Sequence, residues 1–289
     1  MTALIILDKI RFIIMLPLIL LTAVTTPRPV DTESADFITQ KMYVAEQALV
    51  CGQGATAGDG YIYTSGAIAA LNLTFLGRID LETMTYADRV INPLPDVCRE
   101  RGNNHIGGIS YYNGKIYAPV EGGDVTYACI VVYDAENLEE TGEVYDLPNE
   151  YYDDGIPWLA VDPETGLLYA SKWSHADRVY VYDVNDGMKQ VKEIGLTGIG
   201  ELDRIQGGEF LNGKLYLSQD SKDSGTVKKI LTLDIQTGNV NVAAERDVNG
   251  TNTEAEDMTF VIREGETRML VIDYNKIIGI FMREYNIPV

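Results

Sequence analysis

A short hairpin sequence recurs along this chain and limits its fold more than any other feature. Each copy is a glycine-containing turn followed by a strand of apolar and aromatic residues. Five copies occur at intervals of about 50 residues: Asp59-Gly-Tyr-Ile-Tyr63, Asn113-Gly-Lys-Ile-Tyr117, Thr165-Gly-Leu-Leu-Tyr169, Asn212-Gly-Lys-Leu-Tyr216 and, less regularly, Glu264-Gly-Glu-Thr-Arg-Met-Leu-Val271. Because a tight hairpin turn needs a positive φ angle, which glycine adopts readily, each copy predicts a β-hairpin.

A second element follows each of the first four hairpins. It is an apolar strand that ends in aspartate just before a turn, as in Leu76-Gly-Arg-Ile-Asp80, Val131-Val-Tyr-Asp134, Tyr180-Val-Tyr-Asp183 and Leu231-Thr-Leu-Asp234. We expect these aspartates to accept hydrogen bonds from backbone amides in the turns, rather than to do chemistry. A fourth strand then follows, and four antiparallel strands in about 50 residues form one blade of a β-propeller.

The two ends of the chain are expected to complete the ring. The fifth unit ends at Val289 without an outer strand, and an apolar segment at residues 41–50 precedes the first hairpin without a partner. Pairing the two removes an exposed sheet edge. The sequence therefore predicts an all-β protein with a single β-propeller of five four-stranded blades, in which the N-terminal strand completes the last blade. A ring of six blades is the alternative, if one repeat is compressed.

The best-formed hairpin, Trp158-Leu-Ala-Val-Asp-Pro-Glu-Thr-Gly-Leu-Leu-Tyr-Ala-Ser171, resembles those of the NHL, YWTD and gluconolactonase-like propellers. Members of this broad group commonly have six blades, and its lactonase branch holds a divalent metal through carboxylate and amide side chains in the central channel. No stretch of this chain matches that metal motif, so no metal ligand is transferred from it. The resemblance implies the fold and not an activity.

The first 26 residues differ from the rest. Asp8, Lys9 and Arg11 precede an apolar run at residues 12–24, which is short for a membrane span, is interrupted by Pro17 and is followed by small residues. We therefore predict a signal peptide at 1–26, a polar tether at 27–40 and the propeller domain at 41–289. The protein is then secreted and free of the membrane, the alternative being an uncleaved N-terminal anchor.

Export affects the interpretation of the cysteines and of two asparagines. The chain has three cysteines, so one disulfide and one remaining thiol are expected in an oxidising compartment. We predict a bridge from Cys51 to Cys98, with Cys129 a buried apolar side chain. Asn72 and Asn249 each begin an Asn-x-Thr sequence, the acceptor pattern for glycosylation.

The strongly negative net charge of the chain limits which partners it can bind. The formal net charge is −20 at pH 7, which repels a phosphate backbone, so nucleic acid is not expected as a partner. Such acidity favours solubility, and we expect a monomer. It also attracts cations.

Function is expected on the face of the ring where the loops entering the inner strands gather. The strand register places one polar residue of each blade at the central opening: Gln53, His105, Asp154, Gln206 and Glu256. Asp154 and Glu256, with the adjacent Asp257, form a candidate site for Ca²⁺, which prefers oxygen ligands. The same groups are candidates for general acid and base catalysis. The structural alternative is that the five polar residues at the opening only form hydrogen bonds with water.

Other residues expected on this face widen the candidate ligand site. They combine aromatic rings with the few positive charges of the loops and one further carboxylate: Glu121, Trp158, Lys172, Trp173 and Arg204. Aromatic rings suit a sugar or another flat ligand. For Trp158 the alternative is packing between blades, and for the cations it is pairing with internal carboxylates.

Two functions remain open from the sequence. In the first, a secreted propeller binds a small polar ligand in its central opening and hydrolyses it with the help of a cation, the substrate being a lactone, ester, glycoside or nucleotide. In the second, the same face binds an extracellular protein or glycan without catalysis. The chain has no Gly-x-Ser-x-Gly, His-Glu-x-x-His or Cys-x-x-Cys sequence, so no familiar nucleophile or zinc site decides between them.

Overall fold

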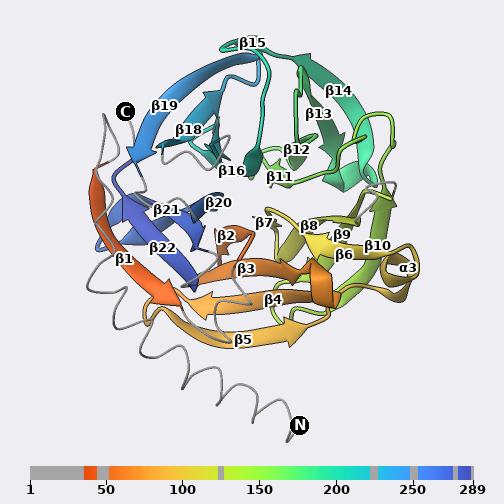
Figure 1. Cartoon of the computed structure of the whole chain (residues 1–289), viewed down its shortest axis with the longest axis horizontal. Coiled ribbons are helices and arrows are strands. Elements are labelled where there is room, and N and C mark those ends of the chain that lie inside the picture. Colours follow the sequence, from red (N-terminus) through yellow and green to blue (C-terminus); the bar gives the residue numbers. More distant parts are fainter. Residues whose placement is uncertain are drawn as a thin grey trace, which may run out of the picture.

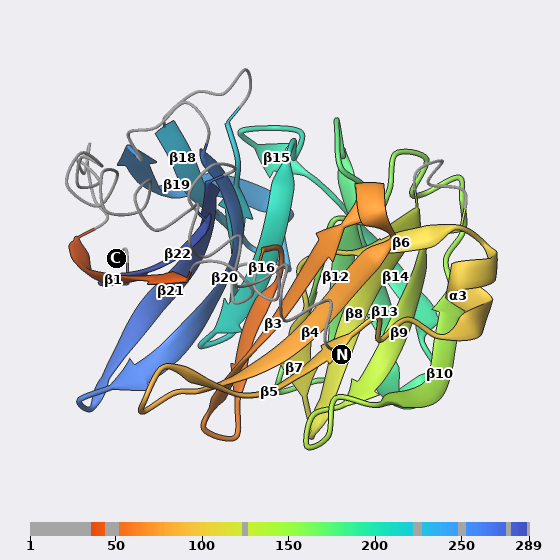
Figure 2. The same ribbon diagram turned by 60° about the horizontal axis from the view of Figure 1, so that its bottom comes forward.

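The computed structural model describes residues 36–43, 52–122, 127–221, 227–247, 253–275 and 279–287. Their strands form five antiparallel sheets arranged in a ring around one axis (Figure 1). This is a five-bladed β-propeller, as predicted, and not the six-bladed alternative. Figure 2 shows the ring turned by 60° from this view, with the blades next to one another around it.

The first three blades follow one another in the chain. Blade 1 contains β2 (Ala55–Gly58), β3 (Tyr61–Ile68), β4 (Leu73–Asp80) and β5 (Thr85–Ile91). Blade 2 contains β6 (Asn103–Ile106) and β7 (Ser110–Tyr112), which both pair with β8 (Lys115–Gly122), then β9 (Cys129–Asp134) and β10 (Glu140–Asp146). Blade 3 contains β11 (Trp158–Val161), β12 (Leu167–Ser171), β13 (Arg178–Asp183) and β14 (Lys189–Gly195).

The last two blades complete the ring. Blade 4 contains β16 (Ile205–Leu211), β17 (Lys214–Gln219), β18 (Val227–Leu233) and β19 (Asn239–Asp247), with β15 (Thr197–Gly198) parallel to β19. Blade 5 contains β20 (Thr253–Arg263), β21 (Glu266–Asn275), β22 (Gly279–Tyr285) and β1 (Phe37–Tyr43). The short helices are η1 (Ala69–Leu71), α3 (Asp96–Glu100) and η2 (Val184–Asp186).

The repeated turns have the conformation that their sequences predict. The glycine of each hairpin has a positive φ angle, at Gly60, Gly114, Gly166, Gly213 and Gly265. The aspartates that end the third strands bind the following turns. Asp134 Oδ1, for instance, accepts hydrogen bonds from the amides of Glu136 and Asn137 at 2.9 and 3.1 Å. Their predicted structural role is confirmed.

The N-terminal strand closes the ring as predicted. Strand β1 pairs antiparallel with β22, with Tyr43 opposite Ile280 and Met42 opposite Phe281. The buried Tyr43 also donates from its hydroxyl to the carbonyl oxygen of Met84 in blade 1, at 3.2 Å, so it joins the last blade to the first. The strand begins at Phe37, inside the segment that we assigned to a tether, because Phe37 packs edge-on against Tyr285.

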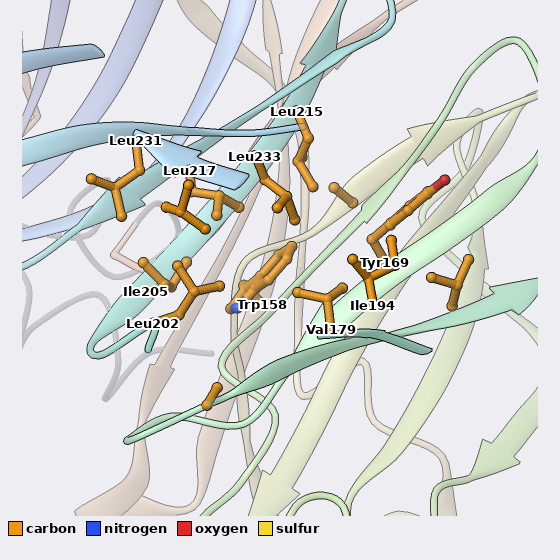
Figure 3. Close-up of a cluster of buried hydrophobic side chains, with 14 of the residues drawn as sticks. Trp158, Tyr169, Val179, Ile194, Leu202, Ile205, Leu215, Leu217, Leu231 and Leu233 are labelled. Atoms are coloured by element: carbon orange, nitrogen blue, oxygen red, sulfur yellow. The ribbon is translucent and has the colours of Figure 1, made fainter. Parts of the chain in front are cut away.

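The spaces between blades are filled by apolar side chains. In the cluster between blades 3 and 4, the Trp158 ring lies among Val179, Leu202 and Leu217 (Figure 3). Its indole nitrogen donates to Ser171 Oγ at 3.0 Å, and its exposed fraction is 0%. The prediction that Trp158 contacts a ligand is therefore wrong. Its large apolar ring is more stable between two sheets than in an open loop.

The cysteines also differ from the prediction. Cys98 and Cys129 are both buried and both free, so the predicted bridge to Cys98 is absent, and Cys51 lies outside the described residues. Cys129 is a buried member of the core of blade 2, as expected.

Several N-terminal and surface predictions are only partly covered by the structure. Residues 1–26 and Asn249 lie outside the described residues, and the exposed Asn72 accepts a hydrogen bond from Asn104 at 2.9 Å. No helix in the described part of the chain is long and apolar enough to span a membrane.

Removing the closing strand should destabilise the whole ring. We expect a chain that starts at residue 44 to lose the β22 pairing and the buried Tyr43, and to melt at least about 10 °C below a matched chain that starts at residue 36. Circular dichroism melting and size-exclusion chromatography of the two chains would check this. Equal melting temperatures with both chains monomeric would contradict the role of β1.

Candidate functional site

Four polar side chains from three blades form a continuous chain near the axis, which we call the axial polar chain: Glu121, His105, Gln53 and Glu256. Glu121 Oε1 lies 3.4 Å from His105 Nδ1, and His105 Nε2 lies 2.9 Å from Gln53 Oε1. Gln53 Nε2 donates to Glu256 Oε1 at 3.4 Å. The chain therefore runs from blade 2 through the loop before β2 to blade 5.

The strand pairing explains this arrangement. His105 lies on β6 directly opposite Glu121 on β8, so the two side chains are cross-strand neighbours. Gln53 comes just before β2, and its carbonyl oxygen accepts a hydrogen bond from the amide of Asp257 at 3.1 Å. That backbone bond places Gln53 beside Glu256, the preceding residue of β20.

His105 is neutral at physiological pH. Burial lowers its pKa to about 4, because the protonated ring would lose hydration. An amide oxygen can only accept, so the contact with Gln53 Oε1 places the proton on Nε2. Nδ1 is then an acceptor, and this buried atom has no hydrogen-bond partner in the structure. A protonated Glu121 carboxyl could donate to it.

Glu121 is the member of the chain best suited to transfer protons. Its pKa is raised to about 7, chiefly by burial and also by the charge of Asp154, although a hydrogen bond from the amide of Ile156 at 2.6 Å acts in the opposite direction. Both protonation states are therefore populated at neutral pH. The side chain keeps an exposed fraction of 18%, so a ligand can reach it. A carboxyl group with these properties can act as a general acid or base.

Glu256 lies deeper than Glu121. Its side chain is buried, and burial together with the nearby carboxylates Glu254, Asp220, Asp257 and Asp273 raises its pKa well above the ordinary value. This shift favours the neutral form of the carboxyl group. Because it has almost no exposed surface, we assign it the role of holding Gln53 in place rather than of touching a ligand.

The Asp257 side chain joins inner strands of different blades beneath the axial polar chain, and Gly207 leaves the space that it occupies. Asp257 Oδ2 accepts from the amides of Ala55 at 2.9 Å and Ile109 at 3.1 Å, and Oδ1 accepts from its neighbour Met258 at 2.7 Å. Burial, with a contribution from the charge of Glu209, raises the pKa of Asp257 well above its ordinary value, although these amide donors act in the opposite direction. A Cβ atom at Gly207 would overlap the carboxylate, so only glycine fits there.

A second polar layer contains another carboxyl group, that of the half-buried Glu209. Glu209 Oε2 accepts from the hydroxyls of Thr56 at 2.8 Å and Thr259 at 3.3 Å, which joins blades 1, 4 and 5. Burial raises the pKa of Glu209 to about 7. The sequence analysis missed this residue, although a glutamate between glycine and phenylalanine in an otherwise apolar strand was a usable signal.

The structure separates the other predicted residues of the central ring. Asp154 accepts hydrogen bonds from the amides of Trp173 and Ser174, at 3.0 and 2.9 Å, and from the Ser174 hydroxyl. It therefore shapes the loop after β12 and acts on the axial polar chain only through its charge. Gln206 is half-buried on β16, and its carbonyl oxygen lies so close to Gly108 that a Cβ atom there would be only 2.6 Å away.

The three residues predicted to bind a cation do not form one centre. The oxygens of Asp154 and Asp257 already accept hydrogen bonds from different loops. Within the described ranges, no three histidine, cysteine, aspartate or glutamate side chains are grouped to hold a metal ion. These residues therefore do not fit a shared calcium ion.

The predicted cations of this face are bound to carboxylates. Arg204 lies over the Trp173 ring, 4.9 Å from its centroid, and donates to Asp220 Oδ2 at 2.6 Å. Lys172 donates to Asp153 Oδ1 at 3.0 Å. Both contacts match the alternative of internal pairing, and Trp173 with Arg204 forms a half-exposed surface beside the ring axis.

The fold is shared with several solved proteins. No model of a protein family matches this chain, and no curated protein matches its sequence. Glutaminyl cyclase from Myxococcus xanthus has a TM-score of 0.61 at 14% identity, covering 88% of this chain and 97% of that one. An exo-1,5-α-L-arabinanase from a bovine ruminal metagenomic library has a TM-score of 0.53 at 14% identity, covering 85% and 94%.

A third solved structure extends the comparison. The allergen Mala s 1 from Malassezia sympodialis has a TM-score of 0.52 at 10% identity, covering 86% of this chain and 78% of that one. At such low identities the likeness establishes the propeller fold alone. The proteins that share the fold include enzymes.

Replacing Asp257 should loosen the centre of the ring. In Asp257→Asn the side chain keeps only one acceptor oxygen, which can face either the amide of Met258 or the amides of Ala55 and Ile109. The NH₂ group then faces the remaining backbone N–H groups, which are left buried without an acceptor. We expect the melting temperature to fall by about 5 °C or more. Asp134→Asn is the matched control, since asparagine also binds a turn. Equal melting temperatures for both variants would contradict the role of Asp257.

Glu209 should make stability depend on pH. Its folded pKa of about 7 lies above the ordinary value of 4.5, so the folded state binds the extra proton between these values, and stability falls as the pH rises through this range. We expect Glu209→Gln to melt several degrees above the unmodified protein at pH 8 and to match it at pH 4.5. Thermal melting across this range would check it, with the exposed Glu164→Gln as control. A constant difference at all pH values would contradict it.

Proposed function

We propose that this protein is a secreted, monomeric enzyme that binds a small polar substrate over the axial polar chain and hydrolyses it by acid and base catalysis. The observation that carries the proposal is the partly exposed Glu121 side chain. It has a pKa of about 7 and lies beside His105, which is neutral because its pKa is lowered to about 4. Glu121 is the residue that exchanges protons with the substrate. His105, Gln53 and Glu256 position it.

The contacts of Glu121 support both halves of a hydrolytic cycle. As a carboxylate it takes a proton from the attacking water, and as a carboxylic acid it returns that proton to the leaving group. The amide of Ile156 fixes one carboxyl oxygen, which leaves the oxygen near His105 Nδ1 to carry the proton. The neutral ring holds the protonated form by accepting from it. The proton therefore stays within the site between the two steps.

The surroundings favour a neutral or cationic substrate. The chain carries a net charge of −20, and Asp153 and Asp154 lie on the same side as Glu121. Lactones, esters and glycosides are the substrate classes that fit, whereas a nucleotide carries a repelled phosphate. The arabinanase that shares this fold suggests one further test substrate, an α-1,5-linked arabinan oligosaccharide.

The second candidate is a module that binds an extracellular protein or glycan without turnover. The half-exposed Trp173 with Arg204 over its ring favours it, because such an aromatic surface suits a sugar or a flat side chain. In this case Trp173→Ala abolishes binding on a glycan array or in a pull-down, whereas Glu121→Gln leaves binding unchanged.

Glu121→Gln should remove catalysis without disturbing the fold. We expect kcat to fall about 100-fold to 10,000-fold on the substrate that the protein turns over, since general acid and base catalysis has this size. The kcat/KM of the unmodified protein should rise with pH around 7, as Glu121 becomes a base, and the variant should lose this rise. Rates would be measured on a panel of lactones, esters, glycosides and the arabinan oligosaccharide.

The matched control is Glu201→Gln. Glu201 Oε2 lies 3.0 Å from His175 Nδ1, so it belongs to a second histidine and glutamate pair, but both of these side chains are mostly exposed. This variant should keep full activity and the same pH profile. Equal losses in both variants, or no turnover of any panel substrate by the unmodified protein, would overturn the proposal in favour of the binding module.

A further inference from the structure

We infer that Cys98 and Cys129 form a disulfide bond inside blade 2 when the protein folds in an oxidising compartment. Their Sγ atoms lie 3.8 Å apart in the reduced structure, and both side chains have an exposed fraction of 0%. Cys98 lies on α3 and Cys129 begins β9. The inference is independent of the proposed enzymatic function.

The local packing holds the two thiols against each other. Both belong to one apolar cluster, together with Leu94, Ile106 and Val120. Asn103 orders the chain that links α3 to β6, since its amide group donates to the carbonyl oxygen of Tyr127 at 2.9 Å and contacts Cys129 Sγ at 3.8 Å. A disulfide needs an S–S distance of about 2.05 Å, so the sulfur atoms must approach by roughly 1.8 Å. Small rotations of the two side chains and of the short helix can supply that movement.

The bond forms by exchange with a small disulfide such as oxidised glutathione. The thiolate of one cysteine attacks this disulfide and releases one glutathione thiolate, and the second cysteine then attacks the mixed disulfide and releases another. The protein loses two protons and two electrons, and oxidised glutathione becomes two glutathione thiols.

Burial determines when this reaction occurs. Neither sulfur is accessible in the folded ring, so oxidation takes place before α3 packs onto blade 2 or during its local opening. Once formed, the bond is shielded from reductants by the same apolar side chains. It would fix α3 to β9 and so restrain the segment that leads into β6, which carries His105.

A peptide map tests the inference directly, because trypsin places each cysteine in a separate peptide. Cleavage after lysine and arginine gives residues 42–78 with Cys51, 90–99 with Cys98 and 116–172 with Cys129. The protein is refolded with reduced and oxidised glutathione, treated with iodoacetamide in denaturant, and digested without reduction. We expect peptides 90–99 and 116–172 to be linked, and Cys51 to be alkylated.

Variants and reductant give a second measurement. Cys98→Ser should lower the melting temperature of the oxidised protein by about 5 to 15 °C, the range expected for loss of a disulfide that closes a loop of this length. Cys51→Ser is the control and should leave both the linked peptides and the melting temperature unchanged. Dithiothreitol should break the bond in denaturant much faster than in the folded protein.

The map of the unmodified protein decides the question even if a variant fails to fold. A link between peptides 42–78 and 90–99, or complete alkylation of all three cysteines after oxidative refolding, would overturn the inference. Equal melting temperatures for the oxidised and the reduced protein, with the link present, would overturn the stabilising role that we assign to it.

Discussion

The Asp257 carboxylate, which accepts hydrogen bonds from two other blades, is the contact on which the centre of this ring depends. Five inner strands converge on one axis, and their backbones approach so closely that a side chain at Gly207 would overlap this carboxylate. At that point the backbone amides of Ala55 and Ile109 lie at or directly before the starts of their strands and need a hydrogen-bond acceptor from outside the strand pairing. One side chain supplies it, and so fixes blades 1, 2 and 5 relative to one another.

The same convergence positions the candidate site. Glu256 precedes Asp257, Gln53 lies two residues before Ala55, and His105 lies on the strand that leads towards Ile109. A rigid backbone thus holds the axial polar chain, while burial lowers the pKa of its histidine to about 4 and raises the pKa of its deeper carboxyl group. Acid and base chemistry benefits from such an arrangement, because the groups need no reorganisation when a proton moves.

Much of this architecture could be predicted from the sequence because it depends on local rules. The Asn113-Gly turn and the other glycine-containing turns predict hairpins, and Asp134 and the equivalent aspartates predict the turns that follow the third strands. The two unpaired strands near the ends of the chain predict a pairing with each other. The strand register also placed Gln53, His105 and Glu256 at one opening. Other side chains were misjudged because their partners are distant: Trp158 packs between blades, and Cys98 lies against Cys129.

The sequence by itself determined the period, the four-stranded unit and the strand that closes the ring, since turn chemistry and alternating apolar residues act over a few positions, whereas the structure decided for five blades against six. Only the tertiary structure decided what the polar residues do. Gln53 and Glu256 are separated by 203 positions, and their contact exists only because the ring closes. The protonation of Glu121 likewise depends on how completely its neighbours exclude water. That exclusion is a property of packing, which no local pattern of residues specifies.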